Sequence, residues 1–170
     1  MNRAYFNRQV DKELIAWKND DDKKPLLLRG ARQVGKSSAV RKLSEQFEHF
    51  VELNFEFQKE LATLFEHSQD PHEICSKLSV IFNIPVQAGK TLLFLDEIQA
   101  CIPAISSLRF FHEKYPELHV VAAGSLLEFA LHELPSFGVG RVRSIFMYPF
   151  SFDEFLEAQG ETALIAAKKQ

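Results

Sequence analysis

The amino-acid sequence predicts an α/β fold in which helices cover both faces of a parallel β-sheet. The first observation is a series of short apolar runs, such as residues 91–95, which are typical of strands buried on both faces. The second is that stretches with helical apolar spacing lie between these runs. The third is a glycine-rich loop at 30–37, directly after the first apolar run. Strands that alternate with helices in this way pair in parallel through helical crossovers.

The N-terminal helix is indicated by four apolar residues that share one helical face: Phe6, Val10, Leu14 and Trp17. A polar run at 19–24 follows and is expected to be a solvated loop. We therefore assign residues 1–24 to an N-terminal helix and polar loop, and 25–150 to the core of the fold.

The remaining elements follow the same alternation of patterns. A second helix is predicted by four residues on one face: Val40, Leu43, Phe47 and Phe50. Ser151 and Glu154 form a capping-box pattern, which opens a final helix. Strands are expected at 25–28, 50–55, 91–95, 119–123 and 142–148, further helices at 58–67, 72–83, 102–111 and 126–132, and a Pro/Gly-rich loop at 135–140.

The composition is that of an ordinary globular protein. Of the 170 residues, 46% are hydrophobic and 25% charged, and 16 Phe supply apolar area for a core. A net charge of −3 gives no support for nucleic acid as a partner, although it leaves a local basic patch open. Two Cys are too few for a disulfide framework, and no apolar run is long enough to span a membrane. We expect a reduced, cytoplasmic protein.

The loop at 30–37 has the spacing of a phosphate-binding loop, Gly-x-x-x-x-Gly-Lys-Ser. Its glycines permit positive φ and let backbone N–H groups close around phosphate oxygens. Lys36 places a positive charge on the β- and γ-phosphates, and the hydroxyl of Ser37 can ligate Mg²⁺. A plain glycine-rich turn is the alternative, but the position between a strand and a helix favours a nucleotide site. We expect nucleotide contacts from Gly30, Ala31, Arg32, Gln33, Val34, Gly35, Lys36, Ser37 and Ser38.

Two carboxylates, Asp96 and Glu97, follow the apolar run at 92–95. Carboxylates are uncommon at the end of a buried strand. Asp96 is predicted to hold Mg²⁺, and Glu97 to orient or deprotonate the attacking water. A helix N-terminus enriched in acidic residues is the alternative. The nearby phosphate loop favours a hydrolytic site.

Three further residues are weaker candidates. Ser125 follows the strand at 119–123, where it would sense the γ-phosphate, although Ser125 and Glu128 also match a capping box. Asn54 would restrain Glu97 or simply lie on an exposed strand face. Arg141, in a glycine-containing loop, would contact a phosphate of its own or a neighbouring subunit, or be an ordinary surface arginine.

Four stretches together resemble a known group. They are the loop at 30–37, Leu-Asp-Glu-Ile-Gln at 95–99, Gly-Ser-Leu-Leu-Glu at 124–128 and Pro-Phe-Ser-Phe-Asp-Glu-Phe at 149–155. In this order they are similar to the bacterial and archaeal AAA-type P-loop ATPases known only as ATP-binding proteins. Members of that group usually carry a C-terminal domain of unknown function.

The resemblance implies a P-loop NTPase fold, a three-layer αβα sandwich with a five-stranded parallel sheet in the order 5-1-4-3-2. It also implies that residues 151–170 begin a helical lid or linker and that the chain stops before the rest of it. The implied partners are ATP, Mg²⁺, the missing C-terminal domain or another protein, and further copies of the chain.

The function predicted from these motifs is Mg-ATP binding and hydrolysis, with catalytic roles for Lys36, Glu97, Ser125 and Arg141. The cycle would drive a conformational change in attached domains or partners. The alternative is a nucleotide-gated regulatory or DNA-associated module with little turnover. A small-molecule kinase is less consistent with the sequence, because nothing marks an acceptor pocket.

Overall fold

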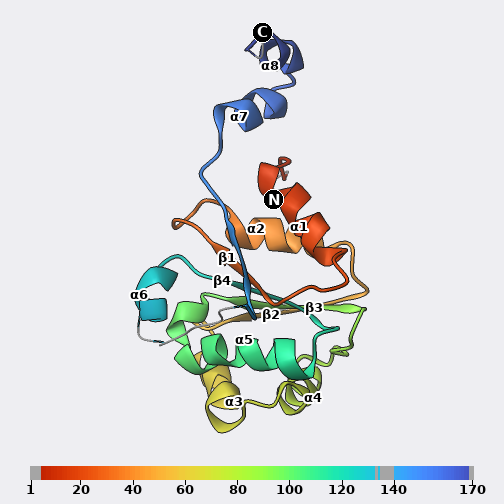
Figure 1. Cartoon of the computed structure of the whole chain (residues 1–170), viewed down its shortest axis with the longest axis vertical. Coiled ribbons are helices and arrows are strands. Elements are labelled where there is room, and N and C mark those ends of the chain that lie inside the picture. Colours follow the sequence, from red (N-terminus) through yellow and green to blue (C-terminus); the bar gives the residue numbers. More distant parts are fainter. Residues whose placement is uncertain (1–4, 133, 135–139, 169–170) are drawn as a thin grey trace.

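A five-stranded parallel sheet forms the centre of the molecule in the computed structural model, which describes residues 5–132, 134 and 140–168 (Figure 1). The strands are β1 (Leu26–Arg29), β2 (His49–Asn54), β3 (Thr91–Asp96), β4 (His119–Ala123) and β5 (Arg143–Phe146). Their order across the sheet is β2-β3-β4-β1-β5, and every neighbouring pair is parallel. The predicted strand order is therefore confirmed.

Helices cover both faces of this sheet, as Figure 1 shows. One face carries α1 (Gln9–Lys18) and α2 (Lys36–Ser44). The other face carries α3 (Ala62–His67), α4 (Pro71–Phe82) and α5 (Ile102–Lys114). Short elements lie near the strand ends: η1 (Lys59–Leu61), η2 (Ile98–Ala100) and α6 (Leu127–His132).

Alternate residues of the strands fill two separate apolar cores. Leu26 and Leu28 of β1 pack with α1 and α2, whereas Leu27 faces the layer of α3, α4 and α5. β3 shows the same alternation, and all six of its residues are buried. Because both faces are covered, the central strands have no polar side, which explains their continuous apolar runs.

The start of the N-terminal helix differs from the prediction. Val10, Leu14 and Trp17 are buried as expected, but Phe6 precedes the helix and is half exposed. The helix begins at Gln9 because the Asp11 carboxylate accepts a hydrogen bond from the backbone N–H of Arg8 at 2.7 Å. At the other end, Trp17 Nε1 donates to the carbonyl oxygen of Lys24 at 2.7 Å and fastens the helix to the start of β1.

α2 is shorter than the predicted helical face, whose last residue, Phe50, is also the first residue of the predicted strand at 50–55. α2 ends at Ser44, and Phe50 lies in β2, which starts at His49 and pairs with Thr91 of β3. Phe47 and Phe50 nevertheless pack against the same apolar core as α2. A turn changed the backbone direction without changing the face that these side chains cover, so the apolar pattern gave no sign of the helix end.

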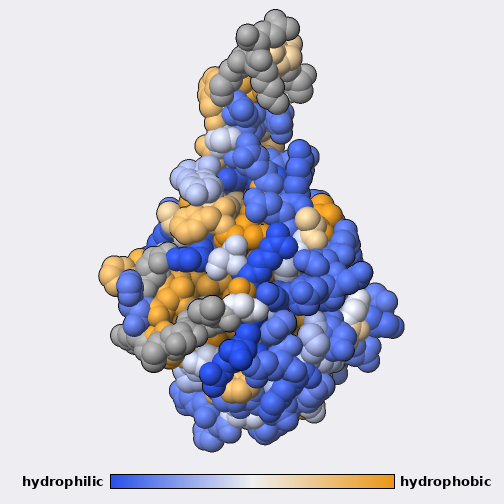
Figure 2. Space-filling view, viewed as in Figure 1, coloured by the Kyte–Doolittle hydropathy of each residue, from blue (hydrophilic) through white to orange (hydrophobic). Residues whose placement is uncertain are grey.

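The C-terminal helices project away from the sheet (Figure 1). α7 (Phe152–Ala158) opens with the predicted capping box, in which Ser151 and Glu154 bond each other's backbone N–H groups. α8 (Thr162–Lys168) follows. Figure 2 shows apolar residues gathered around α6 and along the segment leading to α7, whereas the outer surface of the α3–α5 layer is mostly hydrophilic. Most of the predicted Pro/Gly-rich loop, residues 135–139, lies outside the described residues.

Candidate functional site

The glycine-rich loop joins the carboxyl end of β1 to the first turn of α2. Its backbone takes positive φ at Gly30 (145°), Gln33 (64°) and Gly35 (99°). A Cβ atom on Gly30 would also overlap the carbonyl oxygen of Met147, just after β5. Glycine is therefore required at position 30 by the adjacent backbone of Met147 as well as by the turn.

Lys36 begins α2 and turns its side chain back under the loop. Its side chain is buried, and Nζ donates to the carbonyl oxygens of Gly30 at 2.8 Å and Ala31 at 2.7 Å. Burial lowers the pKa of Lys36, although the nearby carboxylates of Glu97 and Asp96 act to raise it. An ammonium has three donors, so these two carbonyls leave one for an anion in the loop.

Ser37 and Asp96 meet at the floor of the loop. Ser37 Oγ donates to Asp96 Oδ2 at 2.8 Å, and the backbone N–H of Glu97 donates to Asp96 Oδ1 at 3.0 Å. Burial raises the pKa of Asp96 above its usual range, against the lowering effect of these hydrogen bonds. β3 thus carries a carboxylate directly beside the hydroxyl that follows Lys36.

A pocket of about 240 Å³ lies over these residues at the carboxyl ends of β1, β3 and β4. It brings together side chains that the sequence separates by up to 93 positions, from residue 32 to residue 125. The residues that line it are Arg32, Gln33, Gly35, Lys36, Ser37, Ser38, Glu97 and Ser125. The carboxyl ends of the strands are where ligands bind in open α/β sheets.

Most of the predicted site residues therefore line one pocket, and Gly30, Ala31, Val34 and Asp96 contribute to its frame. Gly30 and Ala31 supply the carbonyl oxygens that hold Lys36, and the carbonyl oxygen of Val34 accepts a hydrogen bond from Arg8. Ser125 lines the pocket, and α6 begins two residues later, at Leu127. The side chain of Glu128, on which the capping-box alternative depends, lies outside the described residues.

Arg141 does not join this pocket in its own chain. It precedes β5, at the amino end of the sheet, and Nε lies 2.7 Å from Glu113 Oε1 near the end of α5. Both side chains are partly exposed, at 50% for Arg141 and 39% for Glu113. A contact between Arg141 and the phosphates of a neighbouring subunit stays a prediction.

The side-chain oxygen of Asn54 bonds the turn after β2 and not Glu97. Its Oδ1 accepts from the backbone N–H groups of Glu56 at 3.0 Å and Phe57 at 3.2 Å. These bonds stabilise the turn after β2. The side chain that reaches Glu97 is instead Gln99, whose Nε2 donates to Glu97 Oε2 at 2.6 Å.

Arg8 is a site residue that sequence reasoning missed. Its guanidinium donates to Val34 O at 2.9 Å, to Tyr148 O at 2.9 Å and to Glu154 Oε1 at 3.0 Å. It therefore connects the phosphate loop with the segment that leads to α7. No local pattern could reveal this, because the partners of Arg8 lie 26, 140 and 146 positions along the chain.

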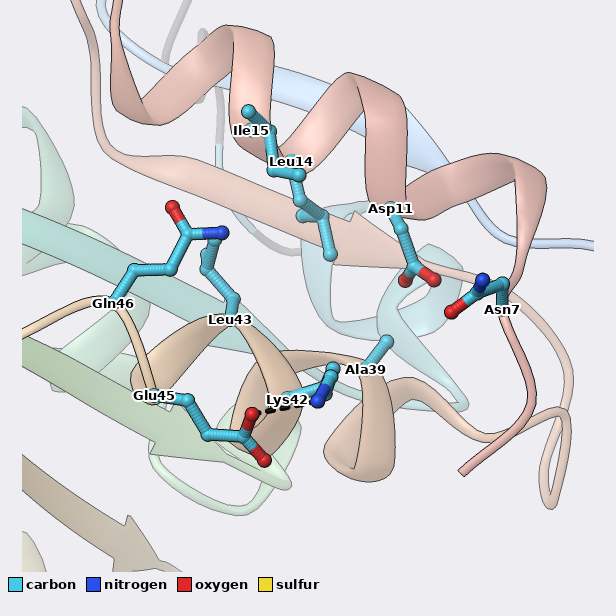
Figure 3. Close-up of a pocket in the computed structure, with 9 residues that line it drawn as sticks. All are labelled: Asn7, Asp11, Leu14, Ile15, Ala39, Lys42, Leu43, Glu45 and Gln46. Carbon is cyan, nitrogen blue, oxygen red and sulfur yellow. Dashed lines mark hydrogen bonds and ion pairs between the residues drawn. The ribbon is translucent and has the colours of Figure 1, made fainter. Parts of the chain in front are cut away.

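A larger cavity, of about 330 Å³, lies between α1 and α2 (Figure 3). Leu14, Ile15 and Leu43 form its apolar side, while Lys42 and Glu45 form an ion pair at its rim. It contains no side chain of the phosphate loop or of the acidic pair. We assign function to the smaller pocket because that pocket holds the converging charged and hydroxyl groups.

The oxygen donors beside the loop fit a magnesium ion. Mg²⁺ prefers a few hard oxygen ligands and completes its octahedron with water and phosphate oxygens. Ser37 and Asp96 supply a hydroxyl and a carboxylate at adjacent positions. Among the described residues, no group of three or more His, Cys, Asp or Glu is placed to hold a metal by itself.

The sequence profile of the AAA domain family matches residues 22–156, which contain every residue of the pocket. A search of curated protein sequences gave no significant match. In the described part of the chain, no helix has the length and apolar character needed to cross a membrane.

Solved structures share the fold at low sequence identity. A Walker-type ATPase of Pyrococcus abyssi is 20% identical, with a TM-score of 0.58 over 94% of this chain and 59% of that one. The Aeropyrum pernix ORC1 protein in complex with DNA is 13% identical, with a TM-score of 0.56 over 94% of this chain and 50% of that one. AMPPCP-bound DnaA from Aquifex aeolicus is 14% identical, with a TM-score of 0.51 over 91% of this chain and 48% of that one.

The chain thus spans about half to three-fifths of the length of these structures. Their structural similarity supports the fold, whereas the family assignment rests on the match of the sequence to the family profile. The motif order, the strand order and the family match over residues 22–156 agree. This chain therefore belongs to the AAA domain family and has the fold of a P-loop ATPase, with its phosphate loop between β1 and α2.

Proposed function

We propose that this chain binds Mg-ATP and hydrolyses the bond between its β- and γ-phosphates. The observation that carries the proposal is the convergence of Lys36, Ser37 and Glu97 on one pocket, with Asp96 hydrogen bonded beneath it. A positive charge, a hydroxyl and two carboxylates in this arrangement suit a metal-bound polyphosphate.

Each side chain has a separate role in the proposed reaction. Lys36 and the backbone N–H groups of the loop bind the β- and γ-phosphate oxygens. Ser37 and Asp96 hold Mg²⁺, which when bound neutralises charge on the phosphates. Glu97 accepts a proton from a water molecule as its oxygen bonds to the γ-phosphorus. The bond to the β–γ bridging oxygen breaks, and ADP and inorganic phosphate leave.

Ser125 supports this assignment from the neighbouring strand. It follows β4 and lines the same pocket as Glu97. A hydroxyl at this position can donate to a γ-phosphate oxygen, which distinguishes a triphosphate from a diphosphate. The proposal therefore includes a difference in affinity between ATP and ADP that depends on Ser125.

Coupling to attached domains or partners is the second part of the proposal. Arg8 bonds the loop through Val34 and the C-terminal segment through Tyr148 and Glu154. A shift of the loop on nucleotide binding would move the Arg8 guanidinium, which also bonds Glu154 of α7. The resemblance assigns residues 151–170, which include α7 and α8, to the start of a helical lid or linker.

The test compares phosphate release from Mg-ATP by the wild-type chain and by Glu97→Gln. Loss of a general base is expected to lower kcat by about 10²- to 10⁴-fold while nucleotide binding is kept. Glu117→Gln serves as control, because Glu117 is an exposed acid in the turn before β4, at the amino end of the sheet. Phosphate release by Glu97→Gln at the wild-type rate would contradict the assignment.

The second candidate function is a nucleotide-gated, DNA-associated module with little turnover. It is favoured by the shared fold with an ORC1 protein whose structure is a complex with DNA. The same assay separates the two candidates. Tight Mg-ATP binding without phosphate release, together with nucleotide-dependent DNA binding, would replace hydrolysis as the function.

A further inference from the structure

The backbone after β3 turns sharply and brings Gln99 back to Glu97. Glu97 takes a left-handed conformation, with φ 48° and ψ 45°, and the single turn of η2 begins at the next residue. Gln99 Nε2 then donates to Glu97 Oε2 at 2.6 Å. One oxygen of the carboxylate is therefore bonded to a neighbouring amide, while Glu97 still lines the phosphate pocket.

The other end of the Gln99 amide lies against the end of β4. A Cβ atom on Gly124 would overlap Gln99 Oε1 and would lie 3.2 Å from Gln99 Cδ. Gln99 Oε1 is buried and has no hydrogen-bond partner among the described residues. Gly124 in turn directly precedes Ser125, which lines the pocket. The amide thus fills the space between Glu97 and the segment that carries Ser125.

We propose that Gln99 is the positioning residue of Glu97, and that position 124 is glycine to leave room for the Gln99 amide. This rests on the proposed function, in which Glu97 accepts the proton of the attacking water. A carboxylate with one oxygen held by a fixed donor has lost rotational freedom, and its second oxygen has a defined direction. Asn54, the other candidate for this role, is engaged by the turn after β2.

The proposal connects the functions of two separate stretches of the sequence. Asp-Glu-Ile-Gln at 96–99 supplies the carboxylate and the amide, and Gly-Ser at 124–125 supplies the surface against which the amide rests. A displacement of Ser125 by a bound γ-phosphate would reach Glu97 through this contact. Gln99 therefore links the carboxyl end of β3 to the carboxyl end of β4.

The test separates kcat from nucleotide affinity in Gln99→Leu, which replaces the amide with an apolar side chain that is one heavy atom smaller. We expect kcat to fall on the order of 10- to 100-fold through misplacement of the base. The Kd for a fluorescent ATP analogue and the Tm should stay close to wild type. Gln87→Leu, at an exposed glutamine before β3, is the matched control and should leave kcat, Kd and Tm unchanged.

A double-variant cycle tests the link to Gly124. Gly124→Ala should lower kcat as Gln99→Leu does, and the combined variant should lose no more than either one alone, since both changes remove the same hydrogen bond. Multiplied losses would overturn the link. If Gly124→Ala fails to fold, the cycle between Gln99→Leu and Glu97→Gln decides, because Gln99→Leu should have no further effect without the Glu97 carboxylate.

The outcomes distinguish this inference from the proposed function. Should Glu97→Gln abolish phosphate release while Gln99→Leu keeps or exceeds the wild-type kcat, Gln99 is not the positioning residue and the function of Glu97 stands. Should Glu97→Gln release phosphate at the wild-type rate, or the wild-type chain release none, both proposals are wrong.

Discussion

At the scale of single residues, the pocket depends on a buried lysine. Lys36 is 7% exposed and donates to two carbonyl oxygens of its own loop. Burying an ammonium is costly unless charges and hydrogen bonds compensate it. Here the carboxylates of Glu97 and Asp96 compensate it only in part, since the pKa of Lys36 is still lowered. A polyphosphate would complete the compensation.

This gives a prediction for the pH dependence of nucleotide affinity. Phosphate binds to the protonated form of Lys36, so affinity falls as pH rises through the lowered pKa of this group. Above that pKa the loss approaches about tenfold per pH unit, and it begins below the usual lysine value of about 10.4. Fluorescence titrations of an ATP analogue over this range measure it.

Lys36→Ala is the matched comparison for that titration. Its affinity should be low at every pH, with no step in the alkaline range. A wild-type affinity that stays constant up to the usual pKa of lysine would contradict the prediction.

At the scale of elements, α1 and α7 are joined by a buried ion pair between Arg8 and Glu154. Burial acts to raise the pKa of Glu154, but hydrogen bonds from the backbone N–H groups of Ser151 and Gln9 and from Arg8 outweigh it. The pKa of this carboxyl is therefore below its usual value. Its stabilising contribution is present above the unfolded-state pKa and is lost as pH falls through the lowered, folded-state pKa.

Glu154→Gln is expected to loosen α7 from α1. The substitution removes the charge that three donors bond, which should cost about 1–3 kcal/mol of unfolding free energy. Hydrogen exchange should speed up most in α7, and the difference from wild type should shrink at low pH. Glu157→Gln, on the exposed side of the same helix, is the control. Equal exchange in both variants would show that the ion pair does not hold α7.

The elements also show what the sequence can and cannot predict. The buried strands and the capping box at Ser151 have local patterns, so their positions were predicted closely. The end of α2 had none, because Phe47 and Phe50 continue the apolar spacing while the backbone turns into β2. The pocket could be predicted from the strand ends, but Arg8 and Gly124 act through contacts that only folding creates.

At the scale of the whole molecule, the sheet order sets the position of the site. β1 lies between β4 and β5, so the phosphate loop is next to the end of β4 on one side and the end of β5 on the other. Side chains from β3 and β4 therefore meet the loop at one edge. The proposed ligand would be held by three segments that are distant in sequence, and its binding should stabilise the entire fold.

Thermal unfolding measures that stabilisation. At a nucleotide concentration about 100-fold above Kd, mass action adds about 2.7 kcal/mol. For a chain of 170 residues, this raises the Tm by about 5–10 °C. The shift should require Mg²⁺ for its full size and should vanish in Lys36→Ala. A shift of equal size in that variant would place the nucleotide outside the loop.

The contact between Gly30 and Met147 has a mechanical consequence. The chain leaves the sheet after β5 at the point where Met147 touches the first glycine of the loop, and α7 and α8 continue outward from there (Figure 1). At 1.5 Å per residue, each of these seven-residue helices is about 10 Å long. They extend from a point that lies beside the phosphate loop. A rotation of a few degrees at that point would therefore move the end of α8 by ångströms.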